Sequence, residues 1–345
     1  MPADFYSEFD SPATIEAIAG ALRSEGHTVH LVEADEELPR WFLAHPVDLV
    51  FNIAEGTCGG HRESQVPALL EVLNIPFTGS NSITLALALD KAKTKQILAS
   101  EGLYTPAWQL FATPEADLDP RLQFPLIVKP NREGSAKGLS RESVVWEASS
   151  LRRQVRRVYE QYRQEVLVEE YIEGTELTIG VLGNHDDVQP LPVLEIDFEG
   201  CERSGEFFYS WRMKEFQGNE ELGLNPTLHC PARLDPATAA IVQAVAMRVH
   251  RLLGCHELSR TDIRLRKDGL PFVLEVNPLP GLSPQESNFP IMTAAAGLPY
   301  AAFINRLVEM ALARYRQGAH VQEPSSPPPI ALPAAEGLVV SRTAP

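Results

Sequence analysis

The sequence lacks the features that mark secreted and membrane proteins. It has no run of about 18 apolar residues, the length that a helix needs to span a bilayer. Its first residues, MPADFYSEFDSPATIE, contain neither a basic nor an apolar stretch, so no signal peptide is expected. Its few cysteines form no C-x-x-C pair, which argues against a disulfide framework or a zinc site; they are Cys58, Cys201, Cys230 and Cys255. These absences predict a soluble protein of the cytoplasm.

Positive charge is also scarce. The chain has 30 Lys and Arg against 46 Asp and Glu, a formal net charge of −16. Nucleic-acid backbones and anionic membranes bind clustered Lys and Arg, so neither is an expected partner. A nucleotide is not excluded, because it needs only a few local cations. At 345 residues the chain is long for one hydrophobic core, which predicts two or three lobes.

The N-terminal part alternates helix and strand patterns. The expected elements are a helix at 12–26, strands at 27–34 and 47–54, a short helix at 38–44 and, after a polar Gly-rich turn at 55–63, a helix at 67–73. Such alternation predicts a parallel sheet covered by helices. Because the chain opens on a helix, either its true start lies upstream or the sheet lacks one edge strand.

A strand at 124–130 leads into a loop of small residues, Gly134 to Gly138. Small residues, free N–H groups and one cation, Lys137, predict a flexible hairpin that covers phosphates. A plain surface turn is the alternative explanation. The loop is not a Walker A loop, which needs G-x-x-x-x-G-K-[ST] at the start of a helix.

The rest of the chain reads as further helices and strands. We expect helices at 83–102, 149–163, 236–253 and 298–316, and strands at 165–172, 176–183 and 190–199. In the helix at 83–102, the lysines are expected to lie on the solvent-exposed face; they are Lys91, Lys93 and Lys95. The third helix is expected to turn four residues inward: Ile241, Val245, Val249 and Leu252. The polar segment 200–232 is long enough to be a functional cover, and the proline-rich tail from 317 is expected to be disordered.

The pair Asp268-Gly269 is the strongest hairpin signal in the chain, because it separates two runs of alternating apolar and polar residues. If these two residues form the turn, paired positions sum to 537. Asp262 then lies directly opposite Glu275. One pair further along the strands, Arg260 lies opposite Asn277.

This register predicts a cation site. Side chains alternate between faces, so Glu275 and Asn277 share one face, and Phe272, Leu274 and Val276 take the other. Two carboxylates opposite each other repel and destabilise the pair, whereas a bound cation between them removes that cost. Carboxylates with an amide oxygen suit Mg²⁺ or Mn²⁺ held together with substrate phosphates. A solvated hairpin face with a chance acidic pair is the alternative.

Seven stretches together resemble the D-alanine–D-alanine ligase branch of the ATP-grasp superfamily, over Glu8 to Arg316. They are IPFTGS (75–80), LALDKAKTK (87–95), IVKPNREGSAKG (127–138), VEEYIEGTE (168–176), FFYSWRMK (207–214), RTDIR (260–264) and LEVNPLPG (274–281). The resemblance implies an α/β protein with α+β lobes. Its expected parts are an N-terminal parallel α/β domain (1–88), a central lobe with the phosphate-covering loop (89–183), a C-terminal lobe with the metal site (184–316) and a disordered tail (317–345).

The resemblance also implies an enzyme that joins a carboxylate to an amine through an acyl phosphate, with ATP and Mg²⁺ (or Mn²⁺). Asp262, Glu275 and Asn277 would hold two Mg²⁺ ions that bridge the ATP phosphates. A second set would bind the nucleotide: Lys91, Lys129 and Lys214 at the phosphates or the adenine edge, Glu169 at the adenine amino group, the backbone of Glu170, Tyr171 and Ile172 as the hinge, and Glu176 at the ribose hydroxyls.

Catalysis would depend on three more positions. Arg260 would stabilise the tetrahedral intermediate, aided by the N–H of Gly281. Ser135 and its loop would close over the phosphates and exclude water. Ser287 would bind the carboxylate of the second substrate, unless it is an ordinary loop serine.

The departures from the family pattern concern the substrates. Glu55-Gly56 stands where these ligases carry a His-Gly pair, and Glu215 replaces a tyrosine. The glutamate that fixes the amino group of the first substrate matches only Glu8. Because buried polar groups discriminate strongly between substrates, we expect another amino acid or an amine acceptor at least as much as D-alanine on both sides.

Three functions therefore stay open, all with small-molecule substrates. They are an ATP-dependent carboxylate–amine ligase, an ATP-grasp module that only binds nucleotide, and a small-molecule kinase. The presence of Asp262, Glu275 and Arg260 disfavours the second, and Gly281 with Ser287 disfavours the third. A homodimer is common among enzymes of this kind.

Overall fold

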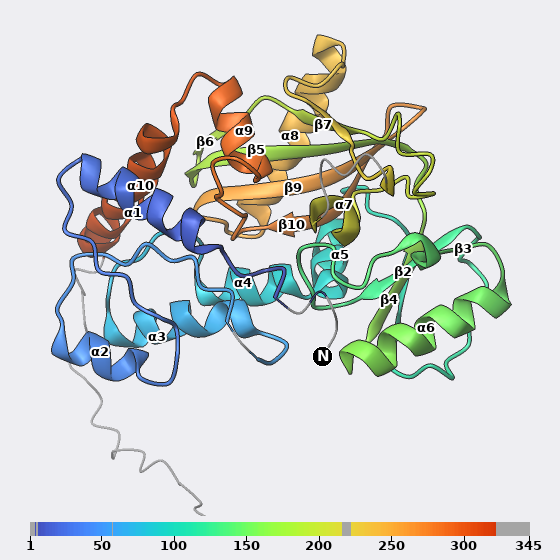
Figure 1. Cartoon of the computed structure of the whole chain (residues 1–345), viewed down its shortest axis with the longest axis horizontal. Helices are drawn as coiled ribbons and strands as arrows, with labels where there is room; N and C mark the ends of the chain where they lie inside the picture. The colour runs from blue at the N-terminus through green and yellow to red at the C-terminus, as the bar shows by residue number, and fades with distance from the viewer. Residues whose placement is uncertain (1–3, 5, 57, 216–221, 322–345) are drawn as a thin grey trace, which may run out of the picture.

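The computed structural model describes residues 4, 6–56, 58–215 and 222–321, which form two sheets flanked by helices (Figure 1). The four-stranded sheet has the order β1-β4-β2-β3, and the six-stranded sheet has the path β10-β9-β5-β7-β8 with β6 paired to β5. Every described strand pairing within the two sheets is antiparallel.

The four-stranded sheet forms a small lobe with one covering helix. Its strands are β1 (Trp108–Phe111), β2 (Leu126–Pro130), β3 (Val144–Val145) and β4 (Val166–Glu170), and the helix is α6 (Ala148–Tyr162). All five residues of β2 are buried. Helix α6 places Leu151, Val155 and Val158 in the same core, at helical spacing on one face.

The six-stranded sheet carries the longest strands of the described chain. Its members are β5 (Gly174–Asn184), β6 (Asp187–Pro190), β7 (Leu194–Asp197), β8 (Thr227–His229), β9 (Glu257–Arg266) and β10 (Pro271–Asn277), with α7 (Trp211–Glu215) between β7 and β8. Strand β5 pairs with β9 along ten positions, from Gly174 opposite Arg266 to Gly183 opposite Glu257.

Helix α8 (Pro236–Leu252) packs against this sheet with a face rotated from the predicted one. Asp235 caps it by accepting from the N–H groups of Ala237 and Thr238, as Asp-Pro at a helix start predicts. The predicted inward residue Ile241 is 53% exposed. The buried positions are Val242, Ala246, Val249 and His250, with Val245 and Leu252 partly buried.

The N-terminal strands were predicted wrongly. Within the described residues, 27–34 and 47–54 form no strand, and their one β-bridge joins Val50 to Phe77 in parallel. The Val50 N–H donates to the Pro76 carbonyl at 2.8 Å, and the Thr78 N–H donates to the Val50 carbonyl at 2.9 Å. A parallel ladder needs a partner along its whole length, and here the pairing stops after one bridge. The helices of this part are α1 (Pro12–Ser24), α2 (Leu38–Ala44) and α3 (Gln65–Leu73), with the 3₁₀ turn η1 (Arg62–Ser64).

The single helix predicted over 83–102 is two helices, α4 (Ser82–Leu89) and α5 (Lys91–Ser100). Asp90 separates them because its backbone is extended and its side chain accepts from the Lys93 N–H at 3.1 Å, which caps α5. Asn131 also donates to the Asp90 carboxylate, at 2.9 Å. The break directs the first residue of α5 toward the loop after β2.

The β9–β10 hairpin has the predicted register at its far end but not at its turn. Leu265 pairs with Pro271, and the Arg266 N–H donates to the Leu270 carbonyl at 3.0 Å. The loop therefore holds three residues, 267–269, with Gly269 in the left-handed conformation at φ 84°. A bulge at Leu274 then shifts the ladder, and Asp262 lies opposite Glu275 as predicted. The bulge also places Leu274 on the same cavity wall as Glu275, so its predicted position on the opposite face was wrong.

Two helices, α9 (Asn288–Ala295) and α10 (Tyr300–Val321), close the fold against the six-stranded sheet. Among the described residues, no single helix is long and apolar enough to cross a membrane, and this pair reaches the length only with a bend of 100°. Helix α10 continues into the predicted tail, and residues 322–345 lie outside the described part of the chain.

Candidate active site

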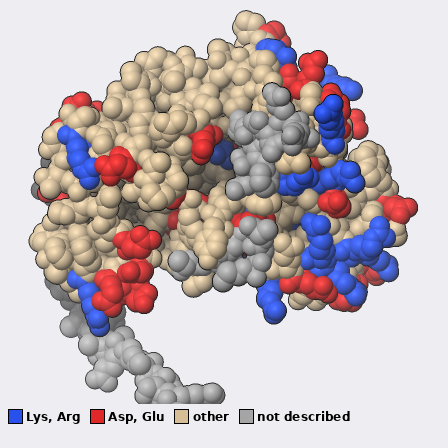
Figure 2. Space-filling view, in the orientation of Figure 1, with Lys and Arg blue, Asp and Glu red and all other residues tan. Residues whose placement is uncertain are grey.

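Two adjoining cavities lie between the two sheets and the N-terminal segment. The large cavity has a volume of about 560 Å³ and the small cavity about 90 Å³. Figure 2 shows a hollow near the middle of this face with charged side chains inside it. Five residues line both cavities: Lys91, Tyr209, Arg260, Glu275 and Asn288. A ligand that occupies one cavity therefore meets side chains that also face the other.

The hairpin brings the three predicted metal ligands together where the cavities meet. Asp262 lies opposite Glu275 in the ladder, and Asn277 is two residues further along β10. The Asn277 amide Nδ2 donates to Asp262 Oδ2 at 3.1 Å, and the Thr178 hydroxyl donates to Asp262 Oδ1 at 2.6 Å. These bonds hold the Asp262 carboxylate in a fixed orientation.

Two cationic side chains balance these carboxylates. Arg260 donates from Nε and Nη2 to the two oxygens of Asp262, at 3.0 and 2.9 Å. Burial alone lowers the pKa of the Arg260 guanidinium, but the carboxylates of Asp262 and Glu275 raise it overall. The Lys91 ammonium lies 3.3 Å from Glu275 Oε2. The carboxylate pair thus meets positive charge on both sides.

The donor set fits a hard divalent cation. It offers two carboxylates and an amide oxygen, which are Mg²⁺ ligands, and no thiolate or imidazole. Within the described ranges, no group of three His, Cys, Asp or Glu side chains is arranged to hold a metal. Two carboxylates alone make an incomplete shell, so the set suits an ion that takes its other oxygens from a phosphate-bearing ligand.

Glu169 lies at the back of the small cavity as the centre of a buried ion triad. Its carboxylate is 2% exposed and lies 2.7 Å from Lys95 Nζ and 2.6 Å from Lys129 Nζ. Burial raises the pKa of Glu169, but the two lysines outweigh it and hold that pKa below its usual range. Burial lowers the pKa of Lys95 to about 8.

Lys95 is a site residue that the sequence reading placed on a solvated face. It is 1% exposed, whereas Lys93 is exposed. The signal was present in the spacing, because Lys91 and Lys95 are four residues apart and so lie on one helix face, while Lys93 points elsewhere.

Glu176 lies on β5 at the mouth of the small cavity. Arg264, missed by the sequence reading, donates to Glu176 Oε2 at 2.7 Å, and the backbone N–H of Tyr209 approaches both carboxylate oxygens at 3.3 Å. Arg264 follows Arg260 and Asp262 at alternate positions of β9, so strand periodicity places all three on one face. The acid is therefore held in place from two directions.

The predicted hinge runs along the wall of the small cavity from Glu170 to Ile172. The Glu170 N–H donates to the Ala107 carbonyl and the Tyr171 N–H to the Pro125 carbonyl, at 2.9 and 3.0 Å. These two N–H groups bond to the backbone of the protein, so they are not available to a ligand. Ile172 is 8% exposed and lines the cavity.

Both glycines at the ends of the loop after β2 have N–H groups that are bonded to carboxylates, although the prediction had them free. The Gly134 N–H donates to Glu8 Oε1 at 2.7 Å, and the Gly138 N–H donates to Asp4 Oδ2 at 2.8 Å. Ser135 lines the large cavity with its backbone in the left-handed region at φ 49°. Left-handed backbone costs roughly 1–2 kcal/mol in a non-glycine residue, so these tethers to the N-terminal segment offset strain in the loop.

Glu8 lies in a balanced ionic network rather than facing the cavity alone. Arg62 Nη2 donates to its two oxygens at 2.7 and 2.8 Å, and Lys137 Nζ donates to Oε2 at 2.9 Å. Glu133 accepts from the same two cations, at 3.3 and 2.5 Å. Burial raises the pKa of Glu8, but Arg62 and Lys137 lower it overall.

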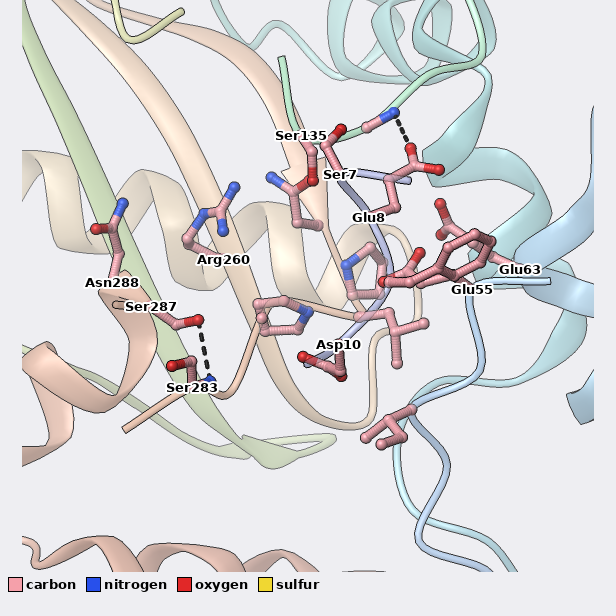
Figure 3. A pocket seen from close by; sticks show the side chains of 18 of the residues that line it. Ser7, Glu8, Asp10, Glu55, Glu63, Ser135, Arg260, Ser283, Ser287 and Asn288 are labelled. Atoms are coloured by element: carbon pink, nitrogen blue, oxygen red, sulfur yellow. Dashed lines mark hydrogen bonds between the residues drawn. The ribbon is translucent and has the colours of Figure 1, made fainter. Parts of the chain in front are cut away.

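Among the described residues, three further carboxylates that line the large cavity and are not exposed have no ion pair or hydrogen bond: Asp10, Glu55 and Glu63. Figure 3 shows Glu8, Glu55 and Glu63 together on one side of the cavity, with Arg260, Ser287 and Asn288 on the other. Burial raises the pKa of Glu63 to about 7 and that of Asp10 to about 6. Burial, and then the charge of Glu63, raise the pKa of Glu55 well above its usual value.

The opposite wall of the large cavity holds Gly281 and Ser287. The Ser287 hydroxyl accepts from the Ser283 N–H at 3.1 Å. A Cβ at Gly281 would lie 2.8 Å from the Ser287 hydroxyl oxygen, so a side chain at this position would displace that hydroxyl. Lys214 lies in α7, but its side chain falls outside the described part of the structure.

Comparisons with known proteins agree with this geometry. Residues 97–309 match the family model described as the D-ala D-ala ligase C-terminus. The chain is 38% identical to a D-alanine–D-alanine ligase of Nitratidesulfovibrio vulgaris (strain DP4), over 88% of this chain and 93% of that one. It is 33% identical to an uncharacterized protein, y4sG, of Sinorhizobium fredii, over 87% and 88%.

A solved structure gives the same result in three dimensions. The D-alanine–D-alanine ligase of Bacillus anthracis complexed with ATP superposes with a TM-score of 0.71 at 25% sequence identity. The superposition covers 90% of this chain and 97% of that structure. The agreement extends over the sheets that form both cavities.

Proposed function

The chain belongs to the D-alanine–D-alanine ligase family of ATP-grasp enzymes, and we propose that it is an ATP- and Mg²⁺-dependent ligase that joins a carboxylate to an amine through an acyl phosphate. The observation that carries this proposal is the juxtaposition of Asp262, Glu275 and Asn277 with Arg260 where the two cavities meet. A nucleotide in the small cavity directs its phosphates toward those residues.

The small cavity supplies the nucleotide contacts in this proposal. Glu169, fixed between Lys95 and Lys129, accepts from the adenine amino group, while Ile172 packs at the hinge. Glu176 binds the ribose hydroxyls, because Arg264 holds its carboxylate at the mouth of the cavity. Lys91 and Lys129 approach the phosphates as flexible point charges.

Asp262, Glu275 and Asn277 would hold the Mg²⁺, which would supply positive charge beside the transferring phosphoryl group. The carboxylate of the first substrate lies in the large cavity near Arg260. That guanidinium stabilises the negative charge that develops on the substrate oxygen, together with the Gly281 N–H. Ser135 and its loop exclude water, which would otherwise hydrolyse the activated carboxylate.

Two further assignments complete the proposal. Ser287 binds the carboxylate of the second substrate, and the lobes extend over 1–88, 89–183 and 184–316. A nucleotide-binding module without ligation has no observation in its favour, since the metal set and Arg260 are both in place. A kinase would need no second substrate beside Ser287.

The test is ADP release from ATP and Mg²⁺ with D- and L-amino acids, supplied singly and in pairs, followed by mass spectrometry of the product. The proposal predicts release that depends on the amino acids and a product one water lighter than the two substrates together. A phosphorylated single substrate would instead identify a kinase. Binding of ATP with no release from any pair would contradict the ligase.

A further inference from the structure

The large cavity carries more negative charge than its own side chains neutralise. Six carboxylates line it. Glu275 is paired with Lys91, and Glu286 is exposed. The other four are Glu8, Asp10, Glu55 and Glu63. They come from two stretches that lie far apart in the sequence, residues 8–10 and residues 55–63. Their convergence needs an explanation, because like charges in a cavity destabilise the folded protein.

The nearby cations are already engaged elsewhere. Arg62 donates to the Arg132 carbonyl, to Glu8 and to Glu133, and Lys137 is paired with the same two acids. Two cations and two carboxylates make a neutral set. Arg62 and Lys137 therefore leave no excess positive charge for the remaining carboxylates of the cavity.

Glu63 shows the deficit most clearly. It is 8% exposed, it lines the cavity, and no hydrogen bond or ion pair joins its carboxylate to any residue in the described ranges. An ionised carboxylate that is buried without a partner costs several kcal/mol. Glu55 lies beside it on the same wall and has no such partner among the described residues either (Figure 3).

The two walls define the ends of a ligand. Arg260 and Ser287 lie across the cavity from Glu55 and Glu63, so a molecule with a carboxylate at one end and positive charge at the other matches both (Figure 3). The α-ammonium of an amino acid pairs with one carboxylate and leaves the other two without a cationic partner. A second cationic group neutralises another, and a cavity of about 560 Å³ has room for the longer chain.

We propose that the first substrate of this enzyme is an amino acid whose side chain carries a second cationic group, bound by Glu63 and Glu55. The proposal rests on the ligase function in that the substrate carboxylate lies at Arg260. It assigns the cation contact to Glu63 and Glu55, and it leaves Glu8 as the residue that positions the loop at Gly134.

Binding of lysine and norleucine tests the proposal, because the two differ only by the side-chain ammonium. Both enantiomers of each are titrated by calorimetry at pH 8 into the protein with Mg²⁺ and a non-hydrolysable ATP analogue. Hydrogen bonds to charged groups are worth about 1.5–3 kcal/mol, so lysine is expected to bind about tenfold or more tightly than norleucine. ADP release with ATP is measured on the same protein.

The variant Glu63→Gln keeps the size of the side chain and removes its charge. It is expected to reduce the ratio of lysine to norleucine affinity about fivefold or more while leaving the affinity for the nucleotide analogue unchanged. The matched control is Glu160→Gln on the exposed face of α6, which is expected to change neither. Unchanged nucleotide affinity shows that each variant is folded.

Each outcome either supports or overturns the proposed cationic substrate. Equal binding of lysine and norleucine, binding of neither, or a ratio that survives in Glu63→Gln overturns it. ADP release with alanine but no lysine preference keeps the ligase and rejects the cationic substrate. A lysine preference that depends on Glu63, without ADP release from any amino-acid pair, keeps the charge recognition and rejects the ligase.

Discussion

In the small cavity Glu169 lies between Lys95 and Lys129, whereas in the large cavity Glu63 lies near Glu55 without an ion pair among the described residues. Both carboxylates are almost fully buried. Their pKa values shift in opposite directions, down for Glu169 and up for Glu63. Glu169 is in ion-pair contact with two lysines, whereas at Glu63 burial outweighs the charges of Arg62 and Lys91. The nucleotide end of the site is thus neutralised by the protein itself, and the substrate end is not.

The two ends of the site also differ in how closely their sequences resemble the family. The balanced end is built from stretches that resemble the family, including IVKPNREGSAKG and VEEYIEGTE. The unbalanced end contains Glu55, where the sequence departs from the expected family pattern, and Glu63 in the turn η1 that follows. The proposed ligase with a cationic first substrate accounts for both.

The largest expected loss of activity follows from changes to Asp262 and Glu275, where the two cavities meet. Replacing Asp262 and Glu275 together by alanine removes two of the proposed metal ligands. ADP release should then fall by about a thousandfold or more, since metal ions supply several kcal/mol of transition-state stabilisation. The matched control is Asp268→Ala in the turn of the same hairpin, where the side chain is half exposed. Release that persists in the double variant would break the proposed metal site.

The variant Glu176→Gln tests the nucleotide end of the site. This change removes the charge that Arg264 orients and weakens the bonds to the ribose, so KM for ATP should rise about tenfold. KM for the amino acid should stay the same, because Glu176 lines only the small cavity. Steady-state kinetics with each substrate varied in turn measures both, and a change confined to the amino acid would contradict the assignment.

The unbalanced end predicts a pH dependence of stability. The pKa of Glu63 is raised from 4.5 to about 7, so the folded protein holds that proton more tightly than the unfolded chain. Its contribution to stability is complete below pH 4.5 and is lost as pH rises through 7. Four charged groups that face Glu63 titrate with it or set its field: Arg62, Glu8, Lys91 and Glu133.

Chemical unfolding of the wild type and Glu63→Gln at several pH values between 5 and 8 tests this dependence. The variant should gain stability relative to the wild type as pH rises, by about 1–3 kcal/mol over the range. A difference that stays constant with pH would show that Glu63 does not titrate in this window.

The smallest expected effect lies on the wall opposite the acids. Ser287→Ala removes one neutral hydrogen-bonding group, worth about 1 kcal/mol, so KM for the second substrate should rise about fivefold. KM for ATP should not change. An effect on ATP instead would mean that Ser287 acts through Asn288, which lines both cavities.

Much of the balanced end was predictable because local rules determine it. The turn signal and strand alternation placed Asp262 opposite Glu275, yet the loop has three residues rather than two, and the bulge at Leu274 restores the register. Sequence alone does not reveal two irregularities that cancel. Hairpin pairing is determined locally, so the predicted pairing of Asp262 with Glu275 was correct although the predicted turn length was wrong.

The unbalanced end was harder to predict because its residues come from separate segments. Glu63 lies in a 3₁₀ turn and Asp10 before α1, and neither has a motif that connects them. The balance of Glu8 by Arg62 depends on tertiary contacts across 54 positions of the chain. Lys95 is the exception, since its spacing from Lys91 gave a usable signal.

The paired variants Glu169→Gln and Glu63→Gln test the central claim most directly, because the same chemical change is made at both ends. Their free energies of unfolding are measured side by side at pH 8. Glu169→Gln leaves two buried lysines without a counter-charge and should destabilise the protein by about 3 kcal/mol. Glu63→Gln removes an unpaired buried charge and should stabilise it. Changes of the same sign in both variants would contradict the account.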